Sequence, residues 1–239
     1  MMKRILYFIF LAAAFTACQD PSALTVERLQ CEWLENPLAI DNTAPHLSWQ
    51  MKSKQNGAAP SAYQILVATS LDRLNEAEAD LWNTGKVSDA ASVGIPYGGK
   101  PLASRSQAYW TVRVWNQDDA PSAWSQPAHF GVGLLKAGDW SADACYIGVE
   151  QADEKTQSAP LLRKQFTYEP VEGTALLYVN SLGYHEAYVN GHPVSDAVLA
   201  PAVSQFAKRS QIVAYDVTSL LKKGENELVL WTGIGWYQT

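Results

Sequence analysis

Short runs in which apolar and polar residues alternate recur along the chain, and this two-residue period is typical of half-buried β-strands. In the first half the clearest runs are residues 47–51 (LSWQM), 62–68 (AYQILVA) and 109–116 (YWTVRVWN). Clusters of Gly, Pro, Asn and Asp separate the runs, and residues 117–122 (QDDAPS) predict a hairpin. The pattern predicts a β-sandwich.

Three tryptophans lie in or beside these runs. Alternation places Trp110 with Val112 and Val114 on one face of its strand. A ring of this size fills much of the space between two packed sheets. We therefore predict that Trp49, Trp110 and Trp124 are core residues rather than ligand-binding residues.

The second half repeats the pattern. Five strands are predicted, at residues 161–168, 175–182, 184–190, 212–215 and 227–232. Asn190 and Gly191 lie between two extended runs and predict a β-turn, in which Gly supplies the positive φ. Asp216 is placed to cap a short turn over residues 216–221. Five strands fall short of the eight in a jelly roll, so we expect an N-terminal fragment, or a truncated reading frame, of a longer protein.

Helical periodicity is confined to residues 71–81, after an N-cap at Ser70, so the predicted fold class is all-β with two consecutive sandwich modules. The first module resembles a fibronectin type III domain, through its early Trp strand, the YWTVRVWN run and the AWS that follows the hairpin. The predicted limits are 1–17 for a signal peptide, 23–133 for the first module, 134–158 for a junction, and 159–239 for a jelly-roll-like module, incomplete at its C-terminus.

The start of the chain predicts export. Residues 1–4 are positively charged and residues 5–15 are apolar, too few to span a bilayer. Ala17 and Cys18 then resemble a bacterial lipoprotein processing site, although Phe15 stands where such sites usually carry an aliphatic residue. We expect a protein of the periplasm or outer membrane, anchored by lipid on Cys18. The alternative is an ordinary secretory signal with Cys18 incidental.

Charge and cysteine content narrow the classes of partner. The formal net charge is −6, and without a basic stripe this excludes a nucleic-acid-binding role and an electrostatic membrane role. The 9 Trp and 11 Tyr suit both sandwich cores and sugar-binding faces. Cys31 and Cys145 are predicted to be free and buried, with a disulfide between them as the alternative. Neither cysteine has a Cys or His close to it in the sequence, so we do not expect a zinc site.

Few side chains suggest chemistry. Asn190 is predicted chiefly to shape its turn, with sugar or calcium binding as the alternative. Trp236 and Tyr237 follow two glycines and are predicted to pack against a neighbouring domain, or else to stack on a pyranose ring. His185 and Glu186 are strand neighbours that point to opposite faces, so they do not form an acid–base pair. We predict no metal site, and no nucleophile elbow is present.

Four motifs of the second half stand in a fixed order: LGYHEAYVNG, VLAP, YDVTSLLKKGEN and GIGWY. Together they resemble the N-terminal β-sandwich domain of bacterial α-L-rhamnosidases of glycoside hydrolase family 78. A fibronectin-like module directly before this domain fits the family's domain order, so the resemblance covers nearly all of the mature chain. The last motif departs from the family pattern, because Ile234 replaces a polar residue that could contact a sugar.

The resemblance implies inverting hydrolysis by two acidic side chains, which in this family belong to an (α/α)-barrel that follows the sandwiches. No catalytic residue is therefore assigned here. We expect the non-catalytic N-terminal part of an exported rhamnosidase, which positions its own downstream catalytic domain and contacts rhamnose-containing glycans. Some family members bind calcium, but no cofactor is assigned to this chain.

Three other interpretations remain open. The chain could be a stand-alone surface lipoprotein that binds carbohydrate without cleaving it. It could be the front part of a β-galactosidase-like glycosidase, whose sandwich carries similar YVNG and DVT…GEN motifs. It could also be a structural spacer that binds no glycan.

Overall fold

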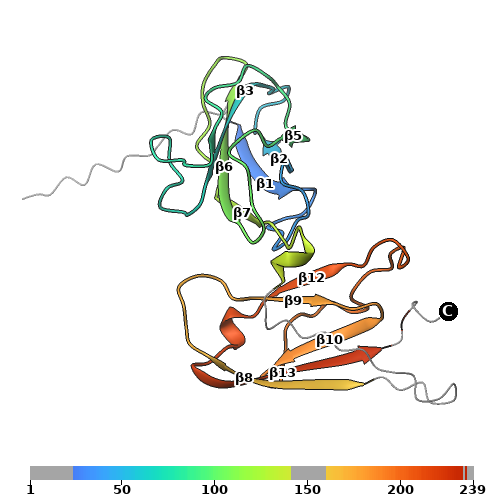
Figure 1. The fold of residues 1–239 in the computed structure, drawn as a ribbon. Coiled ribbons are helices and arrows are strands. Elements are labelled where there is room, and N and C mark those ends of the chain that lie inside the picture. The colour runs from blue at the N-terminus through green and yellow to red at the C-terminus, as the bar shows by residue number, and fades with distance from the viewer. Residues whose placement is uncertain (1–23, 141–159, 234, 236–239) are drawn as a thin grey trace, which may run out of the picture.

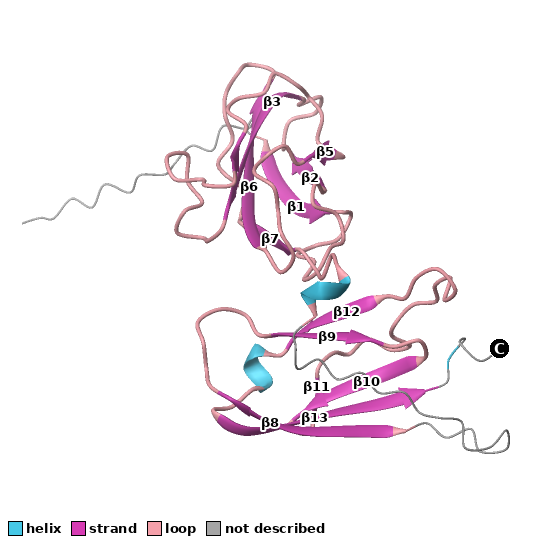
Figure 2. Cartoon of the chain, in the orientation of Figure 1, coloured by secondary structure: helices cyan, strands magenta, loops and turns pink. Residues whose placement is uncertain are grey.

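The computed structural model describes residues 24–140, 160–233 and 235. Two β-sandwich domains follow one another, and a 3-10 turn, η1 (Ala137–Asp139), lies between them (Figure 1). Among the residues described, helical structure is limited to such 3-10 turns, a second being η2 (Thr218–Leu220) (Figure 2). Within the described ranges, no helix has the length and apolar character needed to cross a bilayer. The predicted all-β fold class is confirmed.

The first domain is a sandwich of two antiparallel sheets with strand orders β1-β2-β5 and β4-β3-β6-β7. The strands are β1 (Thr25–Cys31), β2 (His46–Lys52), β3 (Pro60–Ala68), β4 (Trp82–Asn83), β5 (Ile95–Pro96), β6 (Gln107–Asn116) and β7 (Ala128–Gly131). The three strands predicted from alternation correspond to β2, β3 and β6. They supply a large part of the core because both sheets turn their apolar faces inward.

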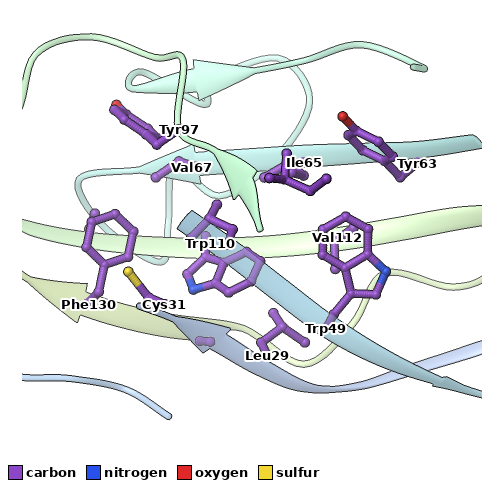
Figure 3. Packing of buried hydrophobic residues seen from close by; sticks show 14 of the residues in the cluster. Leu29, Cys31, Trp49, Tyr63, Ile65, Val67, Tyr97, Trp110, Val112 and Phe130 are labelled. Carbon is purple, nitrogen blue, oxygen red and sulfur yellow. The ribbon is translucent and has the colours of Figure 1, made fainter. Parts of the chain in front are cut away.

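The core of the first domain is built around tryptophan. Trp110 on β6 is fully buried, and Trp49 on β2 is 2% exposed and meets Tyr63 edge to face at 5.4 Å. Figure 3 shows Trp110 between Phe130 and Trp49 in the middle of the cluster. Val112 and Val114 are buried with Trp110. The predicted core roles of Trp49 and Trp110 are therefore confirmed.

The prediction for Trp124 was wrong. This ring is only partly buried and lies outside the core cluster, where the guanidinium of Arg113 stacks on it at 4.6 Å. The same guanidinium contacts the ring of Trp115 at 4.9 Å and donates to the side chains of Gln64 and Glu76. The outer face of β6 is thus covered by stacked cations and rings, an arrangement that alternation alone cannot distinguish from burial.

The predicted helix over 71–81 is also absent, and this segment forms turns. The side-chain oxygen of Asn75 accepts hydrogen bonds from the backbone N–H groups of Ala77 and Glu78. The carboxylate of Asp80 accepts from the backbone N–H and the hydroxyl of Thr69. These side chains offer the backbone alternative partners, which ends a segment too short to be a stable helix.

The second domain has a larger and a smaller sheet, with strand orders β11-β10-β13-β8 and β12-β9. The strands are β8 (Leu161–Tyr168), β9 (Leu176–Asn180), β10 (Tyr184–Val189), β11 (His192–Pro193), β12 (Ile212–Asp216) and β13 (Gly224–Gly233). All five predicted strands are present, and the two-residue β11 adds a sixth. The buried residues of its core cluster are Val179, Val189, Tyr215 and Val217, far fewer than in the first domain.

Two local predictions in the second domain concern turns, and the first of them is confirmed. Asn190 and Gly191 have φ of 53° and 82° between β10 and β11, which is the left-handed pair that a type I′ hairpin requires. The predicted cap at Asp216 takes a different form: its carboxylate accepts from the backbone N–H of Thr218 at 2.9 Å, whereas the N-cap position of η2 is Val217. The first turn joins β10 to β11 within the larger sheet. The second joins β12 of the smaller sheet to β13 of the larger sheet.

The junction is fastened to the first domain by Asp139 at the end of η1. Its carboxylate accepts from the backbone N–H groups of Leu135 and Lys136 and from the hydroxyl of Ser104, and its carbonyl accepts from Arg105. The Ser104 hydrogen bond, followed by the backbone hydrogen bonds, holds the pKa of Asp139 below its usual value. These contacts tie the chain leaving the first domain to the loop before β6.

Candidate functional site

A shallow polar hollow of about 150 Å³ lies beside β10 in the second domain. Its walls come from β10, from the loop after β11 and from β12. The polar side chains that line it are those of His185, Glu186, Tyr188, Ser195, Asp196 and Tyr215. Two carboxylates and two phenols around one hollow provide hydrogen-bond partners for a hydroxyl-rich ligand.

His185 forms the floor of this region and is satisfied within the protein. Ser181 donates its hydroxyl hydrogen to the Gly183 carbonyl, so His185 Nδ1, 2.7 Å from Ser181 Oγ, must be the donor in that pair. Nε2 then accepts from the Tyr215 hydroxyl at 2.9 Å. His185 is 4% exposed, whereas Glu186 points outward, so the predicted separation of these two side chains is confirmed.

Burial lowers the pKa of His185 below its usual value of about 6.5. Between that value and the lowered one, the unfolded chain binds a proton that the folded chain does not. The free energy of unfolding of the second domain should therefore fall as the pH drops below about 6.5. Protonation would also place a hydrogen on Nε2, against the Tyr215 hydroxyl that now donates to it.

We predict that urea unfolding of the second domain, followed by amide NMR signals of β10, shows a lower midpoint at pH 5.5 than at pH 7.5. The variant His185→Gln should lose most of this difference. Glu32 and Asp80 of the first domain have lowered pKa values. Their protonation affects the free energy of unfolding only below about pH 4.5, outside the range compared here. If the urea midpoint depended on pH equally in the wild type and in His185→Gln, His185 would not be the source of the pH dependence.

Asn190, a predicted candidate for sugar contact, is engaged by its own domain. Its amide nitrogen donates to the Leu220 carbonyl at 2.9 Å and to the Asn226 side-chain oxygen at 2.8 Å. Its side-chain oxygen accepts from the backbone N–H of Glu227 at 3.0 Å. A sugar contact that used the amide hydrogens would have to break these bonds, so the turn-forming role is the one that the geometry supports.

The remaining predicted site residues are Cys18, Trp236 and Tyr237, and all three lie outside the described residues, as does Cys145. Cys31 is buried with a free thiol, and burial raises its pKa to about 12. A thiol with this pKa carries almost no thiolate at neutral pH and is inert. In the described part of the chain, no group of three or more His, Cys, Asp or Glu side chains could hold a metal ion.

Two family models match the chain. Residues 26–136 match the Rha78A-like N-terminal immunoglobulin domain, and residues 172–239 match the α-L-rhamnosidase N-terminal domain. The chain carries the N-terminal domains of the α-L-rhamnosidase family. The domain limits at residues 133 and 159 stay predictions.

Relatives and solved structures agree with this assignment. Two α-L-rhamnosidases of Formosa agariphila are 32% and 35% identical to the chain, and the matches cover 98% and 97% of it but 27% and 26% of those proteins. The solved α-L-rhamnosidases of Dictyoglumus thermophilum and Aspergillus terreus have TM-scores of 0.80 and 0.76, at 30% and 28% identity. Each match covers 90% of this chain, but only 25% and 24%, respectively, of the length of those two enzymes. The chain thus spans about a quarter of the length of these rhamnosidases.

The rhamnosidase motifs noted in the sequence have distinct structural roles. LGYHEAYVNG contains β10 and its hairpin turn, and the VLAP loop is fastened to β10 where His185 N–H donates to the Ala200 carbonyl at 2.8 Å. The Asn of GEN is Asn226, which is 3% exposed and bonds Asn190. Sequence reasoning missed Asn226, because it stands between Glu225 and Glu227 at the polar start of β13, where nothing in the sequence marks it as buried.

Proposed function

We propose that this chain is the non-catalytic N-terminal part of an exported α-L-rhamnosidase. It holds the catalytic domain in position and contacts rhamnose-containing glycans. The observation that carries the proposal is the pair of matched domains in family order, spanning about a quarter of relatives named α-L-rhamnosidase. The relatives reported above carry this name, which favours the rhamnosidase over the β-galactosidase-like alternative.

One structural feature supports the positioning role. The bonds of Asp139 to Ser104 and Arg105 fix the junction against the first domain. Bonds of this kind restrain the chain where it leaves the first domain, which suits a support for a further domain.

The proposal includes export and a lipid anchor on Cys18. The support for both is the N-terminal pattern of a short positive segment, an apolar segment and Ala17–Cys18. An anchor at this position would present both sandwiches, and the domain that follows them, on one side of a membrane.

The test is immunocapture of the native protein from the membrane fraction, using an antibody against the second domain, followed by an assay on p-nitrophenyl α-L-rhamnopyranoside. We expect the captured protein to release nitrophenol, and the isolated 239-residue chain to release none. Captured protein without hydrolytic activity would contradict the rhamnosidase assignment and favour a stand-alone binding lipoprotein or a spacer.

A further inference from the structure

The outer face of the β11-β10-β13-β8 sheet carries a group of aromatic side chains around a carboxylate. On β10, His185, Ala187 and Val189 are buried, so the alternate residues Tyr184, Glu186 and Tyr188 point away from the core. On β13 and β8 the residues of the same face include Val229, Trp231 and Leu161. Trp231 is 55% exposed, and Leu161 is 61% exposed.

The strand register brings these residues together. Glu186 lies directly opposite Trp231, which in turn lies opposite Leu161. Tyr188 lies opposite Val229, one pair further along the same face. Side chains in such directly opposed pairs are about 5 Å apart at Cβ, so the rings and the carboxylate form one continuous patch.

Tyr184 extends this patch over two glycines. It lies opposite Gly233, and a Cβ at position 235 would be 3.2 Å from the Tyr184 nitrogen and 3.3 Å from its ring carbon Cδ2. Gly235 also has φ of +57°, a conformation that favours glycine. The glycines of the GIGWY motif therefore leave room for the Tyr184 ring at the end of the sheet.

The carboxylate of Glu186 is held among the rings. The Tyr188 hydroxyl donates to Glu186 Oε2 at 2.6 Å, and this bond raises the pKa of Tyr188. Exposed rings can stack on the C–H face of a pyranose, while a carboxylate accepts hydrogen bonds from its hydroxyl groups. Aromatic rings around an acceptor therefore suit a sugar.

The same face is poorly suited to a protein partner. Arg163 and Glu227 form an ion pair on it, and the Arg163 side chain is 61% exposed. Charged residues are depleted in the core of protein–protein interfaces, whereas Glu186 lies in the middle of this patch. The composition therefore favours a glycan over a second protein surface.

We propose that the outer face around Trp231, Tyr184, Tyr188 and Glu186 binds pyranose residues of a glycan. It shares Glu186 and Tyr188 with the hollow beside β10, and it gives the glycan contact a location. The inference rests on the proposed function only for the choice of a rhamnose-containing probe.

The test is calorimetric titration of the 239-residue chain with rutinose, an α-L-rhamnosyl-glucose. Trp231→Ala and Glu186→Gln should each weaken binding by about tenfold, since each removes one stacking or charged hydrogen-bonding partner. The matched control is Trp33→Ala, because Trp33 is 58% exposed on the first domain, and it should leave the dissociation constant unchanged. Circular dichroism of each variant checks that the fold is retained.

Binding that neither Trp231→Ala nor Glu186→Gln changes would overturn this location while leaving the glycan-binding function in place. If the chain binds neither rutinose nor L-rhamnose, the location and the glycan contact both fail. The rhamnosidase assignment would then still depend on the hydrolysis assay of the captured native protein, so the two failures are distinguishable.

Discussion

Replacing Trp110 by Ala should lower the free energy of unfolding of the first domain by about 3–5 kcal/mol. The ring is fully buried at the centre of the core, between side chains of both sheets (Figure 3). Its removal takes away a large apolar surface and leaves a cavity that β-sheets on either side cannot collapse to fill. The loss is a large fraction of the stability of an ordinary domain.

Urea unfolding followed by tryptophan fluorescence measures this loss. Trp33→Ala is the matched control, because it makes the same chemical change at a position that is 58% exposed, and we expect it to cost less than about 1 kcal/mol. Equal losses in the two variants would show that Trp110 is not the centre of the core.

Replacing Asn226 by Ala should destabilise the second domain by about 2–4 kcal/mol. The Asn226 side chain accepts from Asn190 and from the Lys222 N–H, and it donates to the carbonyls of Lys222 and Gly224. Truncation to Ala removes all of these hydrogen bonds. Because Asn226 is only 3% exposed, water cannot readily replace them. The effect should be severe because the apolar core of this domain is small.

Chemical denaturation followed by amide NMR signals of β13 tests this prediction. Asn180→Ala is the control, since the Asn180 amide also makes hydrogen bonds, to Ser210 and Gln211, but at an exposed site. We expect that variant to lose less than about 1 kcal/mol. If Asn226→Ala were no more damaging than Asn180→Ala, the buried asparagine pair would not be a main support of this domain.

Strands were predictable because their signal is local. Alternation in 47–51 and 109–116 reports which residues face a core, and the Asn190–Gly191 pair reports a turn whatever surrounds it. Local signals fail where a long-range contact decides the outcome. Trp124 has a core-like sequence context, but Arg113, brought alongside it from β6, covers it from outside.

The candidate sites were less predictable because they depend on strand register. The sequence shows that Glu186 and Trp231 lie in strands, but only the pairing of β10 with β13 places them opposite each other. Asn226 and Asn190 are likewise 36 residues apart and meet only in the fold. The sequence likewise shows a glycine before Trp236, but only the fold shows that Gly235 gives room to the Tyr184 ring.

The most direct test of the account is the intact mass of the native protein from the membrane fraction, detected with an antibody against the second domain. The account predicts a lipidated species several times heavier than this chain, as expected for a rhamnosidase of which these two sandwiches are the front part. A lipidated species near the mass of this chain would contradict it and leave a stand-alone binding lipoprotein as the better explanation.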